Sequence, residues 1–108
     1  MILVLGFIVG ITGFSQVQAQ EMDWTGLSRE RIALSLPLII IKGSKGILAC
    51  GYIDPETCNR TKEACAIVTG VMTHEDMLTA EVRSISQRAE ELGLRVGMKG
   101  REAIEILR

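Results

Sequence analysis

Two apolar segments joined by a glycine-bounded turn dominate the hydrophobic pattern of this chain. Within residues 38–54, apolar side chains follow one another instead of alternating with polar ones. Gly43 and Ser44 suit a two-residue hairpin turn, which would place Lys42 directly opposite Lys45. Strands that are apolar on both faces need cover on both faces, from helices or from the sheet of another subunit. The pattern therefore predicts a central hairpin with strands at 38–41 and 47–53.

Shorter segments before this hairpin alternate apolar and polar residues, as half-buried strands do. They are 17–24 and 31–36, with a break at Thr25 and Gly26. Pro37 has no backbone N–H to donate, so it should lie at a sheet edge or at a bulge. We expect an antiparallel meander of three or four strands in the N-terminal half.

The segment after the hairpin carries two helix-start signals. Asp54 can cap a helix and Pro55 suits its first position, so a short helix is expected there. Residues 65–68 then return to the pattern of a strand. Thr73 is a second cap, and it predicts a helix that turns Met77 and Leu78 inward.

Two further helices are expected towards the C-terminus. Residues 81–92 have the most regular helical spacing of apolar positions, and Gly93 follows as a stop. Residues 100–107 form the last helix, which would bury Ala103, Ile104 and Leu107. Strands in one half and helices in the other indicate an α+β fold in a single domain.

Length and charge narrow the classes of function. The 108 residues are enough for one domain, and 12 basic against 13 acidic residues give a net charge of −1. No run of basic residues and only four aromatic residues are present, so nothing resembles a nucleic-acid-binding surface. The sequence predicts no cofactor.

The cysteines are three, an odd number, at Cys50, Cys58 and Cys65. Their spacing fits neither a disulfide framework nor the close pairs of a zinc site, so free thiols in a reducing compartment are the simplest expectation. We accordingly predict no metal site and a cytoplasmic location.

The N-terminal segment 1–14 is apolar and uncharged, and all charged residues lie after Gln20. It has the length of a signal-peptide core but lacks a positive start, and it is too short for a full membrane span. It could also be a mis-assigned start, or a retained helix or strand that anchors the domain to a membrane. We expect residues 1–16 to be an extension, signal-like or anchoring in the alternative of an exported protein, and 17–108 to be the domain.

A thiol and an imidazole are candidates for catalysis. Cys50 lies in an apolar strand beside Gly51, where a ligand could approach the backbone. His74, in the first turn of a helix, is the sole histidine and the only imidazole that could act as its base. The alternative is a buried cysteine that packs as a small hydrophobic residue.

A second candidate site lies at the start of the last helix. Lys99, Gly100 and Arg101 could hold a phosphate or a carboxylate with free backbone N–H groups and two positive charges. The spacing does not match a nucleotide-binding loop. The alternative is that the glycines make a tight turn and Arg101 pairs with Glu105.

Three segments of the chain resemble the YunC-like family, a bacterial and archaeal group of small domains of unknown function. They are LACGYID, AIVTGVMTHEDML and LGLRVGMKGREAIEIL, and the last is the most specific. The resemblance implies an α+β fold whose N-terminal β-sheet part builds a homotetramer. It implies no established catalytic activity and no assigned functional residues.

We therefore expect a self-associating module, non-catalytic or binding a small anion or other ligand, that assembles through its N-terminal sheet. The alternative is a thiol-dependent hydrolase or transferase that uses Cys50 with His74. The expected partner is a second copy of the chain, with a membrane contact only if 1–14 is a retained anchor.

Overall fold

A five-stranded mixed sheet organises the protein in this computed structural model, which describes residues 21–108. The strands run in the order β1-β2-β3-β4-β5, so that neighbours in sequence are neighbours in space. Expectations for 1–20, including the extension and the start of the 17–24 strand, lie outside the described residues. The strands are β1 (Ser28–Ile32), β2 (Leu38–Lys42), β3 (Gly46–Ala49), β4 (Ala64–Ile67) and β5 (Ser84–Ile85).

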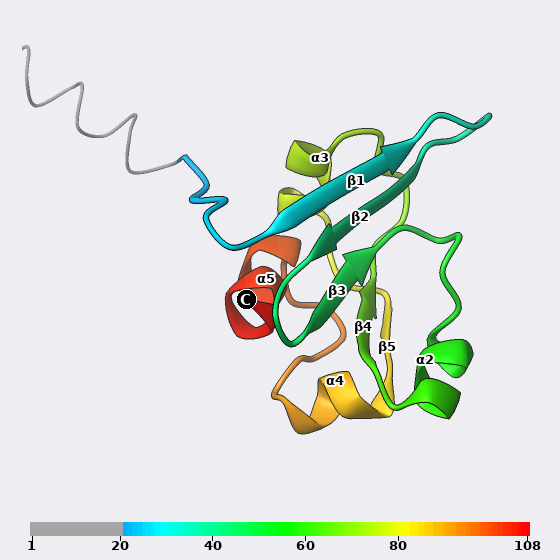
Figure 1. The fold of residues 1–108 in the computed structure, drawn as a ribbon, viewed down its shortest axis with the longest axis vertical. Helices are drawn as coiled ribbons and strands as arrows, with labels where there is room; N and C mark the ends of the chain where they lie inside the picture. Colours follow the sequence, from blue (N-terminus) through cyan, green and yellow to red (C-terminus); the bar gives the residue numbers. More distant parts are fainter. Residues whose placement is uncertain (1–20) are drawn as a thin grey trace, which may run out of the picture.

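Short helices follow the first three strands, so the α+β class is confirmed. They are α2 (Pro55–Thr61), α3 (His74–Thr79), α4 (Gln87–Glu91) and α5 (Gly100–Leu107). The predicted caps are present: the Asp54 side chain accepts from the Glu56 N–H, and Thr73 forms a capping box with Asp76. Figure 1 shows α5 beside the sheet at the C-terminus and α2 near β4.

Only the first part of the sheet is the expected meander. The pairs β1–β2 and β2–β3 are antiparallel, whereas β4 lies parallel to β3 and β5 is antiparallel to β4. A parallel neighbour needs a crossover connection, and α2 supplies it. The β3–α2–β4 unit therefore places the carboxyl ends of β3 and β4 side by side.

The central hairpin is confirmed, but its register differs from the expectation. Lys42 pairs with Ile47, and the Gly43 N–H donates to the Gly46 carbonyl at 2.9 Å. The two turn residues are thus Ser44 and Lys45, one position later than predicted. Neither has a positive φ, so the turn is not of the primed type that the glycine suggested.

The expected strand boundaries before and after the hairpin were also displaced. β1 begins at Ser28 and ends at Ile32, where 31–36 was expected, and residues 21–24 form no strand. The residues 33–37 make the turn into β2. β3 ends at Ala49, because the chain turns away at Gly51 and Tyr52.

The expected helix over 81–92 is wrong in its first half. Val82 is extended: its N–H donates to the Met98 carbonyl, and its carbonyl accepts from Gly97, both at 2.8 Å. The Arg83 N–H donates to Ile67, so this segment joins the sheet as β5. Pairing with residues distant in sequence outweighs the local helical preference. Helix α4 begins only after the cap at Ser86.

The expectation of three free thiols is also wrong. Cys58 on α2 and Cys65 on β4 form a disulfide, with Cα atoms 6.3 Å apart, and only Cys50 is free. The crossover from α2 into β4 reverses the chain within seven residues and brings the two side chains together. A count of cysteines along the sequence does not detect this local reversal.

The core lies on one face of the sheet. Ile39, Ile41 and Leu48 are completely buried there, against α3, α4 and α5. The opposite face is covered at β4, where α2 is bonded through Cys65. As predicted, α5 buries Ala103, Ile104 and Leu107. No helix within residues 21–108 has the length and apolar character to cross a membrane.

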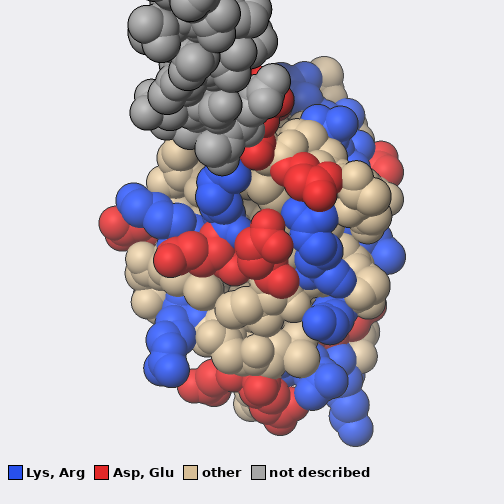
Figure 2. Space-filling model, turned by 90° about the vertical axis from the view of Figure 1, so that its left-hand side faces the viewer, with Lys and Arg blue, Asp and Glu red and all other residues tan. Residues whose placement is uncertain are grey.

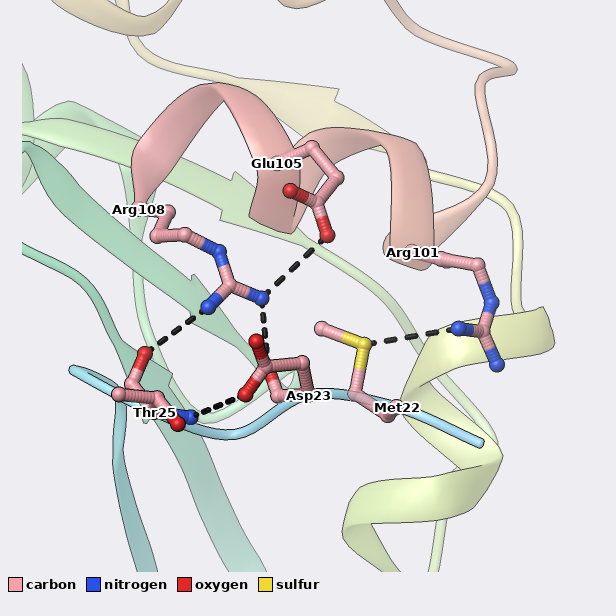
Figure 3. Close-up of polar contacts among 6 residues, drawn as sticks. All are labelled: Met22, Asp23, Thr25, Arg101, Glu105 and Arg108. Carbon is pink, nitrogen blue, oxygen red and sulfur yellow. Dashed lines mark hydrogen bonds and ion pairs between the residues drawn. The ribbon is translucent and has the colours of Figure 1, made fainter. Parts of the chain in front are cut away.

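The last residue ties the segment before β1 to α5 (Figure 3). The Arg108 guanidinium donates to the backbone carbonyl of Thr25 at 2.8 Å and to that of Asp23 at 2.6 Å. It also pairs with Glu105 at 3.3 Å, the carboxylate that was expected to pair with Arg101. Both ends of the described chain are thereby held together.

The carboxyl group of Asp23, beside this contact, makes stability depend on pH. The pKa of Asp23 lies below its ordinary value of 3.8. The main cause is the hydrogen bond from the Thr25 backbone N–H, followed by that from the Thr25 side chain; the positive charge of Arg108 acts in the same direction. A lowered carboxylate pKa stabilises the fold above the unfolded-state pKa, and this stabilisation is lost as the pH falls through the folded-state pKa. We expect Asp23→Asn to flatten the acid limb of a melting-temperature profile, and Glu21→Gln to leave it unchanged. Identical limbs for Asp23→Asn and wild type would contradict this.

Candidate functional site

The sheet leaves an apolar surface on the face opposite the core. Leu38 and Ile40 point to the face of β2 opposite to that of Ile39 and Ile41. Ile32 pairs with Leu38, and Ile47 pairs with Lys42, so both lie on this same face. Ile32 is 55% exposed, whereas Leu38, Ile40 and Ile47 are half-buried. We call Ile32, Leu38, Ile40 and Ile47 the open face. It is the second apolar face that the sequence predicted, and no described residue range covers it as α2 covers β4.

The β1–β2 hairpin adds more exposed apolar surface. All five residues of β1 are exposed, and the turn of this hairpin reaches past the ends of β3 and β4 (Figure 1). Leu34 and Leu36 in the turn are 51% and 63% exposed. Large apolar side chains that gather in this way mark interaction surfaces more often than scattered ones do.

An apolar pocket of about 470 Å³ lies at the carboxyl ends of β3 and β4. Cys50, Gly51 and Tyr52 line it after β3, and the segment from Thr69 to Met72 lines it after β4. Leu36 and Pro37 close it from the β1–β2 turn. We call it the end pocket. Crevices beyond the carboxyl ends of parallel strands are frequent ligand sites in open sheets.

Sequence reasoning found only Cys50 and Gly51 of this pocket. Tyr52, half exposed, and Met72 are exposed side chains that carried no motif. The sequence offered one signal for this pocket: a glycine shortly after each strand, Gly51 after β3 and Gly70 after β4. The two glycines indicate a common site only if β3 and β4 are known to be parallel neighbours. That pairing depends on the crossover and was not predicted.

Cys50 lies at the inner wall of the end pocket. It is 5% exposed, and its sulfur accepts a hydrogen bond from the Ile39 N–H at 3.3 Å. The Cys50 N–H donates to the Ile39 carbonyl at 3.1 Å, so residue 50 continues the pairing of β3 with β2. The side chain packs as part of the core, which agrees with the alternative of a buried cysteine that acts as a small hydrophobic residue.

His74 lies elsewhere, against β1. Its Nε2 is 3.0 Å from the Glu30 backbone carbonyl. Because a carbonyl only accepts, Nε2 must carry the proton of this bond. Within residues 21–108, Cys50 and His74 share no hydrogen bond, and His74 does not line the end pocket. The structure therefore does not bring the proposed nucleophile and base into contact, and their catalytic role stays a prediction.

The candidate anion site at the start of α5 is occupied by protein contacts. The Lys99 N–H donates to Glu102 at 2.9 Å, and the Lys99 ammonium lies 3.8 Å from Glu81. The Gly100 N–H donates to the Ala80 carbonyl, and Arg101 contacts the sulfur of Met22 (Figure 3). Figure 2 shows acidic and basic side chains interspersed over the face that carries α5. Anion binding at these three residues stays a prediction.

Metal coordination has no support among the described residues. Within 21–108, no three side chains of His, Cys, Asp or Glu lie together as the ligands of a metal ion would. Two of the three cysteines are joined to each other, and His74 bonds to a backbone carbonyl.

The sheet with its crossover and short helices defines a known class of small α+β domains. The chain belongs to the family described as domain of unknown function DUF1805, whose model matches residues 49–107. This match begins at the end of β3 and includes β4, β5 and all the described helices. The YunC-like resemblance of the three sequence segments is thereby confirmed.

Two relatives support this assignment. The chain is 32% identical over 80 residues to the uncharacterized protein YunC of Bacillus subtilis (strain 168), covering 68% of this chain and 79% of that protein. It is also similar to the crystal structure of a protein of unknown function, TA1206 from Thermoplasma acidophilum. That similarity has a TM-score of 0.67 and 34% sequence identity, over 76% of this chain and 93% of the other.

Proposed function

We propose that this protein is a non-catalytic module that assembles into a homotetramer through its N-terminal sheet. The observation that carries the proposal is the open face, whose apolar side chains lie on the central strands opposite the completely buried Ile39, Ile41 and Leu48, and on β1 beside them. Apolar surface that is removed from water contributes about 25 cal/mol per Å². A second copy of the same face supplies an apolar surface of matching character.

A closed tetramer needs more than one contact surface. A tetramer of two-fold symmetry is built from two different interfaces, each between identical patches of two copies. The open face is the first surface, and the exposed turn of the β1–β2 hairpin with Leu34 and Leu36 is the second. Apart from Ile47 on β3, both surfaces lie on the β1–β2 hairpin. This hairpin belongs to the N-terminal β-sheet part that the resemblance links to assembly.

The test is the molar mass of the full chain in solution. Light scattering after gel filtration should give four times the 11.8 kDa of one chain at micromolar concentration. Ile32→Glu with Ile47→Glu should shift the mass towards that of one chain, because each buried carboxylate would have to lose its hydration in the interface. Val96→Glu is the matched control, since Val96 is 61% exposed but lies outside the sheet.

Two results would contradict the proposal. One is a wild type that stays monomeric over the whole micromolar range. The other is a folded Ile32→Glu and Ile47→Glu variant with the mass of the wild type. If that double variant does not fold, Ile32→Glu alone decides, because Ile32 is already more than half exposed in one copy.

The thiol-dependent enzyme remains the alternative function, with Cys50 as nucleophile and His74 as base. No contact between the two residues supports it. A small-ligand role would use the end pocket, whose volume lies within the range of about 300–1,000 Å³ typical of ligand sites.

A further inference from the structure

A second hollow, of opposite chemical character, lies at the amino ends of β3 and β4. It has a volume of about 270 Å³ and is walled by the β2–β3 turn, the end of α2 and the start of α4. Its charged residues come from three separate elements of the fold. They are Lys42, Lys45, Lys62, Glu63 and Arg88. We call this hollow the cationic pocket; the end pocket lies at the other end of the same two strands.

Positive charge is concentrated in the cationic pocket beyond what composition predicts. Four cationic side chains line it against one carboxylate, in a chain whose net charge is −1. That carboxylate, Glu63, accepts a hydrogen bond from the Thr61 hydroxyl at 3.1 Å. Among the described residues, no carboxylate lies within ion-pair distance of the three lysines. Their charges are therefore available to an anion.

The turn that carries Lys42 and Lys45 is fixed by the C-terminal end of α5. The Lys45 N–H donates to the Leu107 carbonyl at 2.9 Å, and the Ser44 hydroxyl donates to the Arg108 carbonyl at 2.6 Å. Gly43 packs so closely on the Leu107 carbonyl that a Cβ atom would overlap with it. The turn thus holds its two lysines in place before any ligand arrives.

The opposite wall is fixed by contacts between α2 and α4. Lys62 caps α2 in the left-handed conformation, with φ 63°, three residues before the disulfide partner Cys65. The Gln87 N–H at the start of α4 donates to the Asn59 side chain of α2 at 2.7 Å. The cationic groups of Lys62 and Arg88 are thereby presented from two helices that are bonded to each other.

A neighbouring polar hollow shares two residues with the cationic pocket. It measures about 430 Å³, and Lys62 and Arg88 line both. Its other lining residues carry amide or carboxylate groups: Asn59, Gln87 and Glu91. Asn59 already bonds to the Gln87 N–H and to Glu56, and Glu91 pairs with Arg88 at 3.2 Å. The Gln87 amide and the remaining lone pairs of the Glu91 carboxylate suit hydroxyl groups of a ligand, whereas the lysines suit its phosphate.

We propose that the cationic pocket binds the phosphate group of a small polar phosphate ester, whose hydroxyl-bearing body lies in the neighbouring hollow. Lys42, Lys45 and Lys62 contact the phosphate oxygens, and Arg88 stands between the two hollows. This site borders the open face, because Ile47 lines the pocket and belongs to that face. Its lysines lie at the opposite end of β3 and β4 from the turn of the β1–β2 hairpin. It is also distinct from the predicted anion site at Lys99.

Calorimetric titration of the full chain at low ionic strength tests the proposal, with ribose 5-phosphate and inorganic phosphate as probes. We expect the ester to bind at least about tenfold more tightly than inorganic phosphate, because only the ester reaches the neighbouring hollow. Lys45→Gln with Lys62→Gln should weaken ester binding by about tenfold or more. Arg83→Gln removes an exposed charge outside both hollows and should leave the affinity unchanged. Gel filtration of the same variants keeps assembly and binding distinguishable.

Each remaining outcome would overturn the proposal. No binding of either probe at millimolar concentration removes the site. Equal affinity for both probes would show that the site binds phosphate alone and does not recognise the body of an ester. An equal loss of affinity in Arg83→Gln would show that the anion is attracted only by the overall charge of the protein. A loss of affinity confined to Lys99→Gln would place the anion at the start of α5 instead. Should the lysine double variant not fold, Lys45→Gln alone, in an exposed turn, carries the comparison.

Discussion

Gly100→Ala should lower the free energy of unfolding by about 3 kcal/mol, net of the helix propensity gained. Gly100 is buried at the start of α5, where a Cβ atom would overlap with the backbone carbonyl of Met77. Only backbone movement could relieve the overlap, and the Gly100 N–H bond to Ala80 holds that backbone at 2.8 Å. Urea unfolding at one fixed protein concentration measures the effect, because the proposed assembly would make stability depend on concentration.

Gly51→Ala is the matched control for this substitution. A Cβ atom at Gly51 would meet only the methyl group of Thr69, at an ordinary 3.6 Å. We expect its effect to stay within about 1 kcal/mol of wild type. Equal stabilities of Gly100→Ala and Gly51→Ala would contradict the packing role of Gly100.

Replacing both Cys58 and Cys65 by alanine should cost about 2.5 kcal/mol of stability. The estimate is the loop-closure entropy that a disulfide across seven residues removes from the unfolded chain. For a domain of this size it corresponds to a fall in melting temperature of about 10 °C or more. Dithiothreitol should lower the melting temperature of the wild type similarly and leave the double variant unchanged.

Cys50→Ala is the control, because it removes the free thiol and keeps the disulfide. It should lose only about 1 kcal/mol of stability from packing, and dithiothreitol should lower its melting temperature as much as that of the wild type. Thiol titration of the unfolded, unreduced wild type should find one reactive thiol per chain. Three reactive thiols, or a wild type whose melting ignores reductant, would show that Cys58 and Cys65 are not bonded in the native protein.

Local signals in the sequence were sufficient for several elements of the fold. Asp54 and Thr73 predicted the starts of α2 and α3, because a capping side chain acts on backbone groups only a few residues away. The apolar run at β2 and β3 predicted a strand with two apolar faces, and the open face is the one that remained without cover. These features depend on neighbours in the chain and not on its path.

Features that depend on the path of the chain could not be predicted. The segment at Val82 has helical spacing, but its hydrogen bonds to residues 97 and 98 hold it extended. The parallel pairing of β3 with β4 determines where the end pocket and the cationic pocket lie, and no sequence motif predicts this pairing. Cys50 and His74 formed a reasonable pair by residue type, but each bonds to a backbone group of a different strand, Cys50 to Ile39 and His74 to Glu30, and their catalytic role stays a prediction.

The cationic pocket shows the same limit for function. Its three lysines are separated along the sequence by up to 20 positions and carry no recognisable spacing. Lys42 and Lys45 were expected only to lie opposite each other across a turn. The crossover through α2 brings Lys62 to the same place, and the three charges together form the proposed anion site.

The full exposure of β1 has a thermodynamic consequence for how copies would meet. A strand that buries no side chain is held mainly by its hydrogen bonds to β2, so β1 can separate locally at low cost while the core, which includes Ile39 and Ile41 of β2, stays folded. In the proposed assembly, part of the free energy of association would be spent on ordering β1. The order of β1 and the concentration of the protein would then be linked, and dilution would loosen β1 before it unfolds the core.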